Sequence, residues 1–510
     1  MELNPRLSPK SLCSADRPHS SSILRDLLHF RNPAAAFLVL VLAGVVALQG
    51  YSNREFYLDD ALIALRAGRN WAEGQAPAFN PGEPVLSSTS ALNLILSAAA
   101  SLISASQPDR VMHVFDEIAF CLAALFIALA LRAEGATLAP AVAACAVVAE
   151  PQFHSCYGLE TPFFLMLAAA GVWLRYDRQA LLGGVLGLFL LARPDAAIWA
   201  ALLLLARTQR DRRVPWPALA VTAVIVLPWF IYATITFGSP LPHTLAAKMA
   251  QGRSGFWPEQ LKLLPAFWLS LKGHYSGLAA PVIALLAGAG LLRRRGFLPP
   301  GLLLLAAAAL QLLAYAWLEV PGYDWYFAPF YLALNVLVAL GAEALYRQAR
   351  TRLETAVPQS PRLAQALGIA LAVLACLPLW RLAPRSFALG RPPREQAYEQ
   401  IARWIRQHTP SPASIAAVEV GTLGYYSGRR IVDAAGLVGS TDMSRRLGQR
   451  RFDGWLNEYQ PDLILIHQPI WPLEQVLLDQ TNLRHGYRPL RAFEFPAYSK
   501  LLLLQRRPAN

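Results

Sequence analysis

The stretch that decides the fold is YLDDALIALRAGRNWAEGQAPAFNPGEP, Tyr57 to Pro84, which follows the first long apolar run of the chain. It holds two adjacent aspartates, two arginines and a tail rich in Pro and Gly. Because a single charged side chain costs about 2.5–3.5 kcal/mol at the centre of a bilayer, this stretch cannot cross a membrane. We therefore expect it to lie outside the hydrocarbon, directly against the first apolar helix.

Composition places this polar stretch in a membrane protein. Of 510 residues, 55% are hydrophobic and 15% are charged, and the mean hydropathy is positive. Apolar runs long enough to cross about 30 Å of hydrocarbon recur until Trp380. We predict an α-helical polytopic protein with about eleven transmembrane helices, at residues 34–50, 111–131, 136–150, 161–175, 180–192, 195–206, 215–237, 276–292, 297–318, 326–345 and 363–380.

Charge bias orients these spans. The run from Ser90 to Ser104 is apolar enough to be a twelfth span, but if it lies along the surface, the basic loops join the N-terminus on one side. That side then holds 18 Lys and Arg in 70 residues, against 9 in 117 on the other side, in agreement with the positive-inside rule. We predict a cytoplasmic tail at 1–33 and a transmembrane domain at 34–380, with surface-lying helices in a first outer loop at 51–110.

This orientation brings the polar segments YLDD, EPQFHSCYGLE, ARPD, GSPLPHTLAAK and VPGYDW to the outer face together. The segment from Ala180 to Ala206 is too short for two full crossings at about 1.5 Å per residue, so we expect a short hairpin. Its tip would hold Arg193 and Asp195 below the outer surface, and ionisable residues at such depth are candidates for function. One active site on the outer face explains the convergence.

Beyond Trp380 the composition changes to that of a soluble domain, predicted at 381–510. Glu395 to His408 has the apolar periodicity of an amphipathic helix, and the glycine-rich run from Gly421 to Gly428 is interpreted as a turn. Short strands are predicted at Ile415–Val420, Ile431–Asp433, Leu463–His467 and Leu501–Leu504. We therefore expect a small extracytoplasmic α/β domain.

Asp59 and Asp60 are the first candidates for chemistry. Adjacent carboxylates at a membrane surface are costly unless they bind a cation, pair with arginine or act as a base. Arg66 and Arg69, about two helical turns further on, can be their partners. Two interpretations stay open from these residues alone. The carboxylates can cap a helix, since acidic side chains are favoured in its first turn. Alternatively, they can deprotonate a hydroxyl or hold a divalent cation against a phosphate.

The other outer segments supply further candidates. Lys248 suits a phosphate as a point charge, although a lysine at a membrane interface can simply extend its charge into water. His243 beside it is more often structural. Acids beside aromatic rings can accept hydroxyl protons of a sugar while the rings stack on it, but the rings can equally form an aromatic belt. These residues are Glu160, Tyr323, Asp324 and Trp325.

The sequence also disfavours several classes of function. The net charge of +13 falls mostly in short loops, so nucleic acid is not expected as a partner. The five cysteines lack metal or disulfide spacing. Walker A, dinucleotide-binding, HExxH and GxSxG motifs are absent. Two classes of function remain, namely a reaction with a substrate that is delivered by a lipid, and transport.

Taken together, the motifs resemble a known family. The run from Tyr57 to Ser90 is similar to the first outer loop of GT-C superfamily membrane glycosyltransferases. The most similar branch contains the terminal arabinofuranosyltransferases, whose loop reads approximately DDAxIxxRxARNLAEGxGxxxNPGExVEGxTS. The family's later motifs follow in order: GLET, TRPD or TRPE, YGSPLPNTxxAK, W-Y-F-x-P and GYYSGRxVxDxxGL are matched by residues 158–161, 192–195, 237–248, 325–329 and 424–437.

The resemblance implies a glycosyltransferase of the bacterial cytoplasmic membrane. A polyprenyl-phosphate sugar would be the donor, and an extracytoplasmic glycan, lipid or protein the acceptor. Asp59 or Asp60 would carry the catalytic carboxylate, and a divalent cation stays open as a cofactor. The substrate-binding set expected from the motifs and their neighbours is Arg66, Arg69, Glu160, Arg193, Asp195, His243, Lys248, Tyr323, Asp324 and Trp325.

The sequence departs from the family at two places that bear on the sugar and the acceptor. The family's VEGYT or VEGTT is here VLSST, Val85 to Thr89, which loses an acid, and His243 replaces the Asn of PLPNT. A pentose such as arabinofuranose is the expected donor sugar, while stereochemistry and oligomeric state stay open. The alternative function is a transporter or flippase of lipid-linked sugars, for which repeated spans and charges on interrupted helices would be typical.

Overall fold

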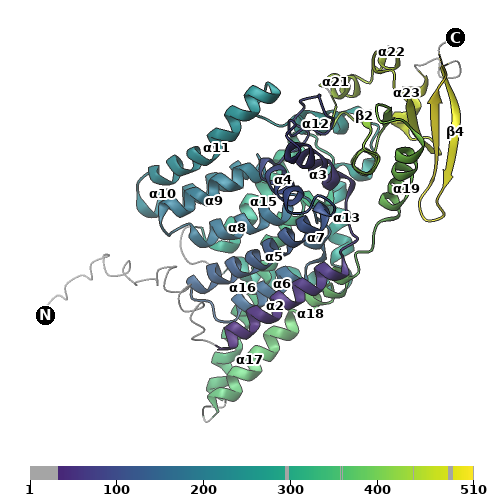
Figure 1. Cartoon of the computed structure of the whole chain (residues 1–510). Coiled ribbons are helices and arrows are strands. Elements are labelled where there is room, and N and C mark those ends of the chain that lie inside the picture. Colours follow the sequence, from purple (N-terminus) through teal and green to yellow (C-terminus); the bar gives the residue numbers. More distant parts are fainter. Residues whose placement is uncertain are drawn as a thin grey trace, which may run out of the picture.

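The computed structural model describes residues 33–292, 298–356, 358, 360–439, 441–479 and 486–508. Figure 1 shows a helical body joined to a smaller unit that contains a β-sheet. The predicted combination of a polytopic helical fold with a C-terminal α/β unit is confirmed. All but the last residue of the predicted N-terminal tail, 1–33, lies outside the described residues.

The helices of the body coincide with the predicted apolar runs. Many of them begin with Pro in the first turn, where its missing N–H costs nothing. Two bounds differ clearly. Helix α10 continues beyond residue 206 and α16 beyond residue 345, each into a basic segment that was predicted as a loop. The helices are α2 (Pro33–Ser52), α5 (Pro108–Ala133), α6 (Ala139–Ala149), α7 (Pro151–His154), α8 (Thr161–Leu174), α9 (Gln179–Ala192), α10 (Ala196–Asp211), α11 (Trp216–Phe237), α14 (Ala279–Leu292), α15 (Pro300–Trp317), α16 (Ala328–Ala356), α17 (Pro361–Ala375) and α18 (Leu377–Trp380).

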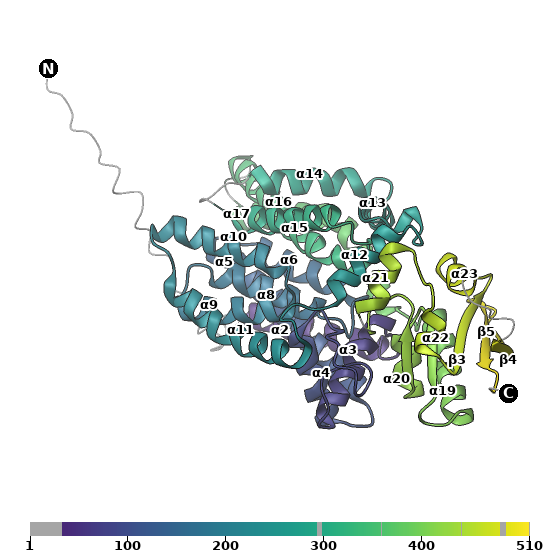
Figure 2. The same ribbon diagram turned by 90° about the horizontal axis from the view of Figure 1, so that it is seen from above.

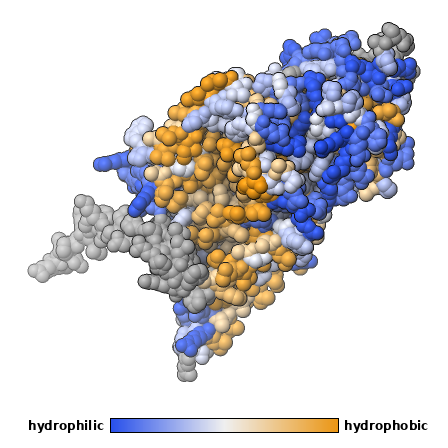
Figure 3. Space-filling model, viewed as in Figure 1, coloured by the Kyte–Doolittle hydropathy of each residue, from blue (hydrophilic) through white to orange (hydrophobic). Residues whose placement is uncertain are grey.

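These helices make the chain a membrane protein. Among the described residues, α5, α11, α15 and α16 are long and apolar enough to cross a bilayer, and up to six spans result if each of two bent helix pairs counts as one. The apolar helices at the other predicted spans are shorter, with α2 counted from Ala36, so the count of eleven and the orientation stay predictions. Figure 3 shows hydrophobic residues spread over the helical body and hydrophilic ones over the α/β unit.

The first outer loop contains the two predicted helices, α3 (Asp59–Ala72) and α4 (Ala91–Ile103). Ser90 caps α4, since its hydroxyl accepts a hydrogen bond from the Asn93 N–H at 2.9 Å. The two helices pack closely because Gly68 has no side chain; a Cβ there would lie 2.4 Å from the Ser97 Cβ. Figure 2 shows α3 and α4 beside the junction between the helical body and the α/β unit.

The second long outer segment is also helical, which the sequence did not predict. It contains α12 (Thr244–Ser254), the short η2 (Glu259–Leu261) and α13 (Leu263–His274). Helix α13 meets α14 at 105°, so it lies across the direction of the helix that follows it. A third connection carries the single turn η3 (Asp324–Tyr326).

The α/β unit begins after η4 (Ala383–Phe387) with the predicted amphipathic helix, α19 (Pro393–His408). Its sheet has the order β2-β1-β3-β5-β4, with β1 parallel to both β2 and β3 and with β5 antiparallel to β3 and β4. The remaining elements are β1 (Ser414–Ala417), α20 (Gly421–Ser427), β2 (Arg430–Asp433), α21 (Thr441–Gln449), α22 (Trp455–Tyr459), β3 (Leu463–Gln468), α23 (Pro472–Asp479), β4 (Tyr487–Glu494) and β5 (Lys500–Arg506).

Two predictions for this unit need correction. The run Gly421 to Gly428 was interpreted as a turn, but residues up to Ser427 form helix α20 and only Gly428, with φ of 65°, ends it in the left-handed region. Strand β4 was not predicted, because it is an edge strand whose side chains are mostly exposed and polar, with Pro489 at an irregularity. Such strands lack the apolar signal of the buried parallel strands.

The core of the α/β unit is completed by the first outer loop. Ile63 of α3 and Phe79, which follows it, pack with Ile401, Leu423 and other buried residues on one face of the sheet. Phe79 is fully buried. Asn80 reinforces the junction by exchanging two hydrogen bonds with the backbone of Ile431, at 2.8 and 3.0 Å. The α/β unit is therefore packed onto the first outer loop and not held by its linker alone.

Close packing of α14 on α16 gives a test of the helical body. A Cβ at Gly290 would lie 2.0 Å from the Leu337 carbonyl oxygen, whereas nothing lies within 4 Å of one at Gly288. We expect Gly290→Ala to lower the stability by about 1–3 kcal/mol through overpacking, and Gly288→Ala to leave it unchanged or slightly raised. Thermal unfolding of the purified protein in detergent measures both; equal melting temperatures for the two variants would contradict this packing.

Candidate active site

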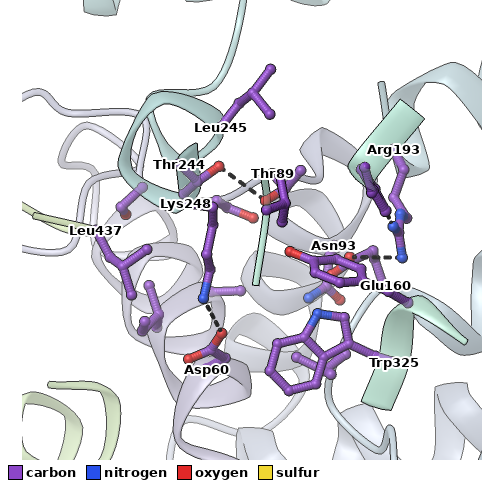
Figure 4. Close-up of a pocket in the computed structure, with 18 residues that line it drawn as sticks. Asp60, Thr89, Asn93, Glu160, Arg193, Thr244, Leu245, Lys248, Trp325 and Leu437 are labelled. Atoms are coloured by element: carbon purple, nitrogen blue, oxygen red, sulfur yellow. Dashed lines mark hydrogen bonds and ion pairs between the residues drawn. The ribbon is translucent and has the colours of Figure 1, made fainter. Parts of the chain in front are cut away.

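A pocket lies where the first outer loop, α12 and the ends of several body helices meet (Figure 4). Its walls combine charged, hydroxyl, amide and aromatic side chains with a few apolar ones. The α/β unit contributes one side chain, Leu437. The lining residues are Asp60, Ile63, Ala64, Ser87, Ser88, Thr89, Asn93, Leu159, Glu160, Arg193, Thr244, Leu245, Lys248, Tyr315, Val320, Trp325, Tyr326 and Leu437.

Asp60 and Lys248 form an ion pair across the pocket. The Lys248 Nζ lies 3.3 Å from the Asp60 Oδ2 and 4.1 Å from the centre of the Tyr323 ring. Burial alone would lower the pKa of Lys248, but the Asp60 carboxylate and Tyr323 outweigh it and raise that pKa above its usual value. The Asp60 carboxylate, which is partly buried, therefore favours the charged ammonium form of Lys248.

Arg193 sits at the tip of the α9–α10 hairpin and is almost fully buried. Asp195 binds its Nε and Nη2 through two hydrogen bonds of 3.0 Å, and the Tyr315 hydroxyl lies 2.6 Å from Nη2. The remaining nitrogen, Nη1, has no hydrogen-bond partner among the described residues; Glu160 is its nearest acid, at 3.7 Å. Asp195 thus fixes the guanidinium, while Nη1 is paired with Glu160 through charge alone and keeps its hydrogen-bonding capacity.

Glu160 lies beside this guanidinium at the start of α8. Burial raises the pKa of its carboxyl group, and Arg193 opposes that shift. Two further pocket groups have no partner among the described residues, namely the Ser87 hydroxyl and the Asn93 Oδ1. Since buried polar groups are nearly always hydrogen-bonded, unpaired groups on a pocket wall indicate a polar ligand.

Asp59 does not line the pocket. Its Oδ2 accepts the Gly421 N–H at 2.8 Å and its Oδ1 accepts the Thr422 N–H at 2.7 Å, so both oxygens are occupied by the start of α20. Adjacent residues of an α-helix point about 100° apart, which is why Asp59 faces the α/β unit while Asp60 faces the pocket. Gly421 allows this contact, because a Cβ there would lie 1.8 Å from the Asp59 carbonyl oxygen.

The structure brings some of the sequence-predicted residues to the pocket and leaves others away from it. Arg66 donates to the Arg429 carbonyl at 2.9 Å, and Arg69 stacks on Tyr425, so both hold the α/β unit and neither pairs with the aspartates. His243 lies near Ser444 of that unit, and Asp324 is exposed. Asp60, Glu160, Arg193, Lys248 and Trp325 line the pocket, while Asp195 and Tyr323 contact its charged residues.

Several pocket residues escaped the sequence analysis. Tyr315 lies inside an apolar run and was counted only as part of a span. The Ser87 to Thr89 segment was noted for losing the family's acid, yet it supplies hydroxyls to the wall, and Thr89 and Thr244 lie 3.0 Å apart through their hydroxyl groups. Asn93 was assigned to the surface helix. Periodicity identifies each of these positions as helix or loop but says nothing about a shared cavity.

A divalent cation was left open from the sequence. Among the described residues, no group of three or more His, Cys, Asp or Glu side chains has the arrangement needed to hold a metal ion. A cation held jointly by one carboxylate and a substrate phosphate needs no such group, so this prediction stays untested.

Parts of the chain are similar in sequence to known proteins. Residues 386–507 match a family model described as Domain of unknown function (DUF8728). Over 249 residues, 42% of this chain, the sequence is 29% identical to the terminal β-(1→2)-arabinofuranosyltransferase of Mycobacterium tuberculosis (strain ATCC 25618 / H37Rv). That match covers 39% of the relative's length.

Two solved structures share the fold. ArnT from Cupriavidus metallidurans bound to undecaprenyl phosphate matches with a TM-score of 0.54 and 14% identity, over 93% of this chain and 99% of ArnT. Its apo structure matches with the same score and identity, over 98% of that chain. The chain therefore shares the fold of ArnT, and the fold expected from the sequence motifs is confirmed at that level.

The Asp59 contact predicts how a mutation would act. Asp59→Asn replaces one acceptor oxygen with an amide that faces a backbone N–H, so we expect a loss of about 1–3 kcal/mol and weaker docking of the α/β unit. Limited proteolysis of the linker between η4 and α19, together with thermal unfolding, measures this. Asp60→Asn is the matched control and should leave cleavage of the linker unchanged; faster cleavage in Asp60→Asn than in Asp59→Asn would refute the assignment.

Proposed function

We propose that the protein is a membrane glycosyltransferase that moves a sugar from a polyprenyl-phosphate donor to a hydroxyl of an extracytoplasmic acceptor. The observation that carries the proposal is the convergence in one pocket of a carboxylate, Asp60, with two fixed cations, Lys248 and Arg193. Transfer of a sugar from a lipid phosphate needs one base and a means of stabilising the departing phosphate. The pocket supplies both.

The proposed reaction is a displacement at the anomeric carbon. Asp60 takes the proton of the acceptor hydroxyl, and the acceptor oxygen forms a bond to the anomeric carbon. The bond between that carbon and the phosphate oxygen breaks, and the polyprenyl phosphate leaves with the electron pair. Lys248 and the Nη1 of Arg193 stabilise the negative charge on the phosphate oxygens.

Asp60 is a better candidate for the base than Asp59. A base needs an oxygen that can reach the substrate, and both Asp59 oxygens already accept backbone N–H groups. Asp60 is held by Lys248 through Oδ2. When a phosphate takes over the ammonium group, the Asp60 carboxylate is free to accept a proton. Asp59 then acts as a positioning residue that fixes the start of α3.

We infer the classes of donor and acceptor from the residues of the pocket and from the relatives. The M. tuberculosis relative is named for transfer of arabinofuranose, and the ArnT structure is described with undecaprenyl phosphate. By analogy we propose a polyprenyl-phosphoryl pentose such as arabinofuranose as donor. The Ser87 hydroxyl and the Asn93 Oδ1, both unpaired among the described residues, would bind sugar hydroxyls. The acceptor would be a glycan, lipid or protein on the outer side of the bacterial cytoplasmic membrane.

Transfer by the purified protein tests this function. We expect product from at least one member of a panel of polyprenyl-phosphoryl sugars that includes arabinofuranose, and a fall of about 10²–10⁴-fold in kcat for Asp60→Asn. Asp453→Asn, which changes an exposed acid of the α/β unit, is the control and should keep the parent rate. Mass spectrometry of donor and product gives the rates.

Two results would count against the proposal. Full activity of the Asp60→Asn variant would show that Asp60 is not the catalytic base. Movement of intact donor across a vesicle bilayer, with no member of the panel consumed, would instead favour the transporter or flippase.

A further inference from the structure

A groove between α2 and α5 forms a second cavity, and no described residue lines both it and the pocket around Asp60. Its volume is about 540 Å³, within the range of about 300–1,000 Å³ that is usual for ligand sites. Figure 1 shows α2 at the surface of the helical body. Val114 and Ile118 of α5 line the groove and are 55% and 52% exposed, so the groove opens sideways, toward the hydrocarbon of the bilayer.

This α2–α5 groove has a polar mouth and an apolar length. Arg54 and Arg110 line it where α2 ends and α5 begins. The Arg54 guanidinium lies 4.4 Å from the ring of Tyr51, an aromatic residue of the kind found at the membrane interface. From Arg54 back to Ala43 the groove extends about 16 Å, which is about half of the hydrocarbon thickness. The groove therefore matches one leaflet, with the arginines at the level of the headgroups.

Contacts outside the groove hold α2 in place. Gln49, which does not line the groove, donates a hydrogen bond to the Ser386 hydroxyl of η4 at 2.7 Å. The two helices come close at Gly50, where a Cβ would lie 2.4 Å from the Glu117 Oε1 of α5. The spacing of α2 and α5 is thus set by other parts of the fold, and the gap between the two helices is part of the structure.

The polar residues of the wall below the mouth are turned to partners inside the helical body. The His113 Nε2 lies 3.0 Å from the Phe56 carbonyl oxygen, and Glu117 accepts a hydrogen bond from the Tyr157 hydroxyl. The other polar side-chain atoms of His113 and Glu117 are buried. A chain in the groove therefore meets the apolar residues of the wall.

Two arginines share one acid at the mouth. The Glu55 Oε1 lies 3.4 Å from the Arg110 Nη2 and 3.9 Å from the Arg54 Nε. Asp109, next to Arg110, does not line the groove. The three side chains of the shared pair are each between 42% and 58% exposed, and exposed ion pairs of this kind are weak. A phosphate can therefore take the place of Glu55 between the two guanidinium groups.

We propose that the α2–α5 groove binds one anionic phospholipid, such as phosphatidylglycerol, with its phosphate between Arg54 and Arg110 and an acyl chain along the apolar wall. Basic pockets between membrane helices bind anionic headgroups, and the planar guanidinium group suits a phosphate through parallel hydrogen bonds. A zwitterionic lipid carries the same phosphate but adds an ammonium group, which two arginines do not attract.

The site would join the two ends of the first outer loop. Arg54 lies shortly before α3, and Arg110 lies shortly after α4. A phosphate bound to both arginines would fix these ends relative to each other, and Asp60 lies on the loop between them. The inference is independent of the proposed transfer reaction, because lipid binding is measured without any substrate.

Lipid binding to the purified protein tests the site. Native mass spectrometry, with phosphatidylglycerol or phosphatidylcholine added in defined amounts, reports the fraction of protein that retains one lipid. We expect the parent protein to bind phosphatidylglycerol at least about 5-fold more tightly than phosphatidylcholine. Arg54→Gln and Arg110→Gln should each weaken the binding of phosphatidylglycerol by about 5-fold. Glu55→Gln removes the competing acid and should keep or raise the affinity.

Two further variants separate the charge from the chain. Arg381→Gln is the matched control, because Arg381 is an exposed arginine after α18 that does not line the groove; it should leave the affinity unchanged. Ala47→Trp fills the apolar part of the groove without changing a charge and should lower the retention of phosphatidylglycerol. Ala47 is exposed, so the larger side chain needs no space in the core. Thermal unfolding of each variant identifies any loss of fold.

Three results would contradict the inference. Equal retention of the two lipids by the parent protein would indicate only a nonspecific lipid shell. Unchanged binding in both arginine variants would place the lipid elsewhere. A Glu55→Gln variant that loses binding as strongly as the arginine variants would make the three side chains a structural ion-pair cluster and not a headgroup site.

Discussion

Two hydrogen bonds from the backbone N–H groups of Gly421 and Thr422 to the Asp59 carboxylate connect the two parts of the molecule. A carboxylate that accepts two N–H groups is held more firmly than one paired with a flexible side chain, since the backbone has no rotamers to lose. This contact fixes the rotation of α3 about its axis. The direction of Asp60, one residue further on, is fixed with it.

Adjacent carboxylates can thus have different tasks because a helix separates them by about 100°. Asp59 binds the α/β unit at the junction, whereas Asp60 faces the pocket, where Lys248 is paired with it and Arg193 adds a second positive charge. Arg193 in turn depends on Asp195 and Tyr315, which leave its Nη1 beside Glu160 and without a hydrogen-bond partner among the described residues. The matched Domain of unknown function (DUF8728) at residues 386–507 is then part of the architecture of the pocket, because its first helix after β1 positions the loop that carries the proposed base.

Much of the fold could be predicted from the sequence, because long apolar runs and charge bias report directly on helices that cross or border a membrane. The apolar run from Ser90 to Ser104 likewise predicted a helix, which is α4; its position along the membrane surface stays a prediction. These signals failed for α12 and β4, which are short and polar and are stabilised by their neighbours, and for α20. The glycines of α20 are typical of a turn, but they are there to allow the close approach of α3.

The sequence predicted part of the pocket's lining and not its arrangement. The ordered motifs identified Asp60, Glu160, Arg193 and Lys248 as site residues. The shortness of the segment that forms α9 and α10 predicted that Arg193 lies below the outer membrane surface. The choice between Asp59 and Asp60 depends on which partner each meets across several hundred residues of sequence, and periodicity carries no such information. Tyr315 was missed for the same reason, since a tyrosine in an apolar run looks ordinary until the fold places it beside a pocket.

The most direct test of the account is a cryo-EM structure of the Asp60→Asn variant with a polyprenyl-phosphoryl pentose bound. The account predicts the donor phosphate between Lys248 and the Nη1 edge of Arg193, with the anomeric carbon facing residue 60 and the Asp59 carboxylate still bound to Gly421 and Thr422. A donor whose phosphate lies elsewhere, or an Asp59 side chain that has left α20 to face the sugar, would contradict it.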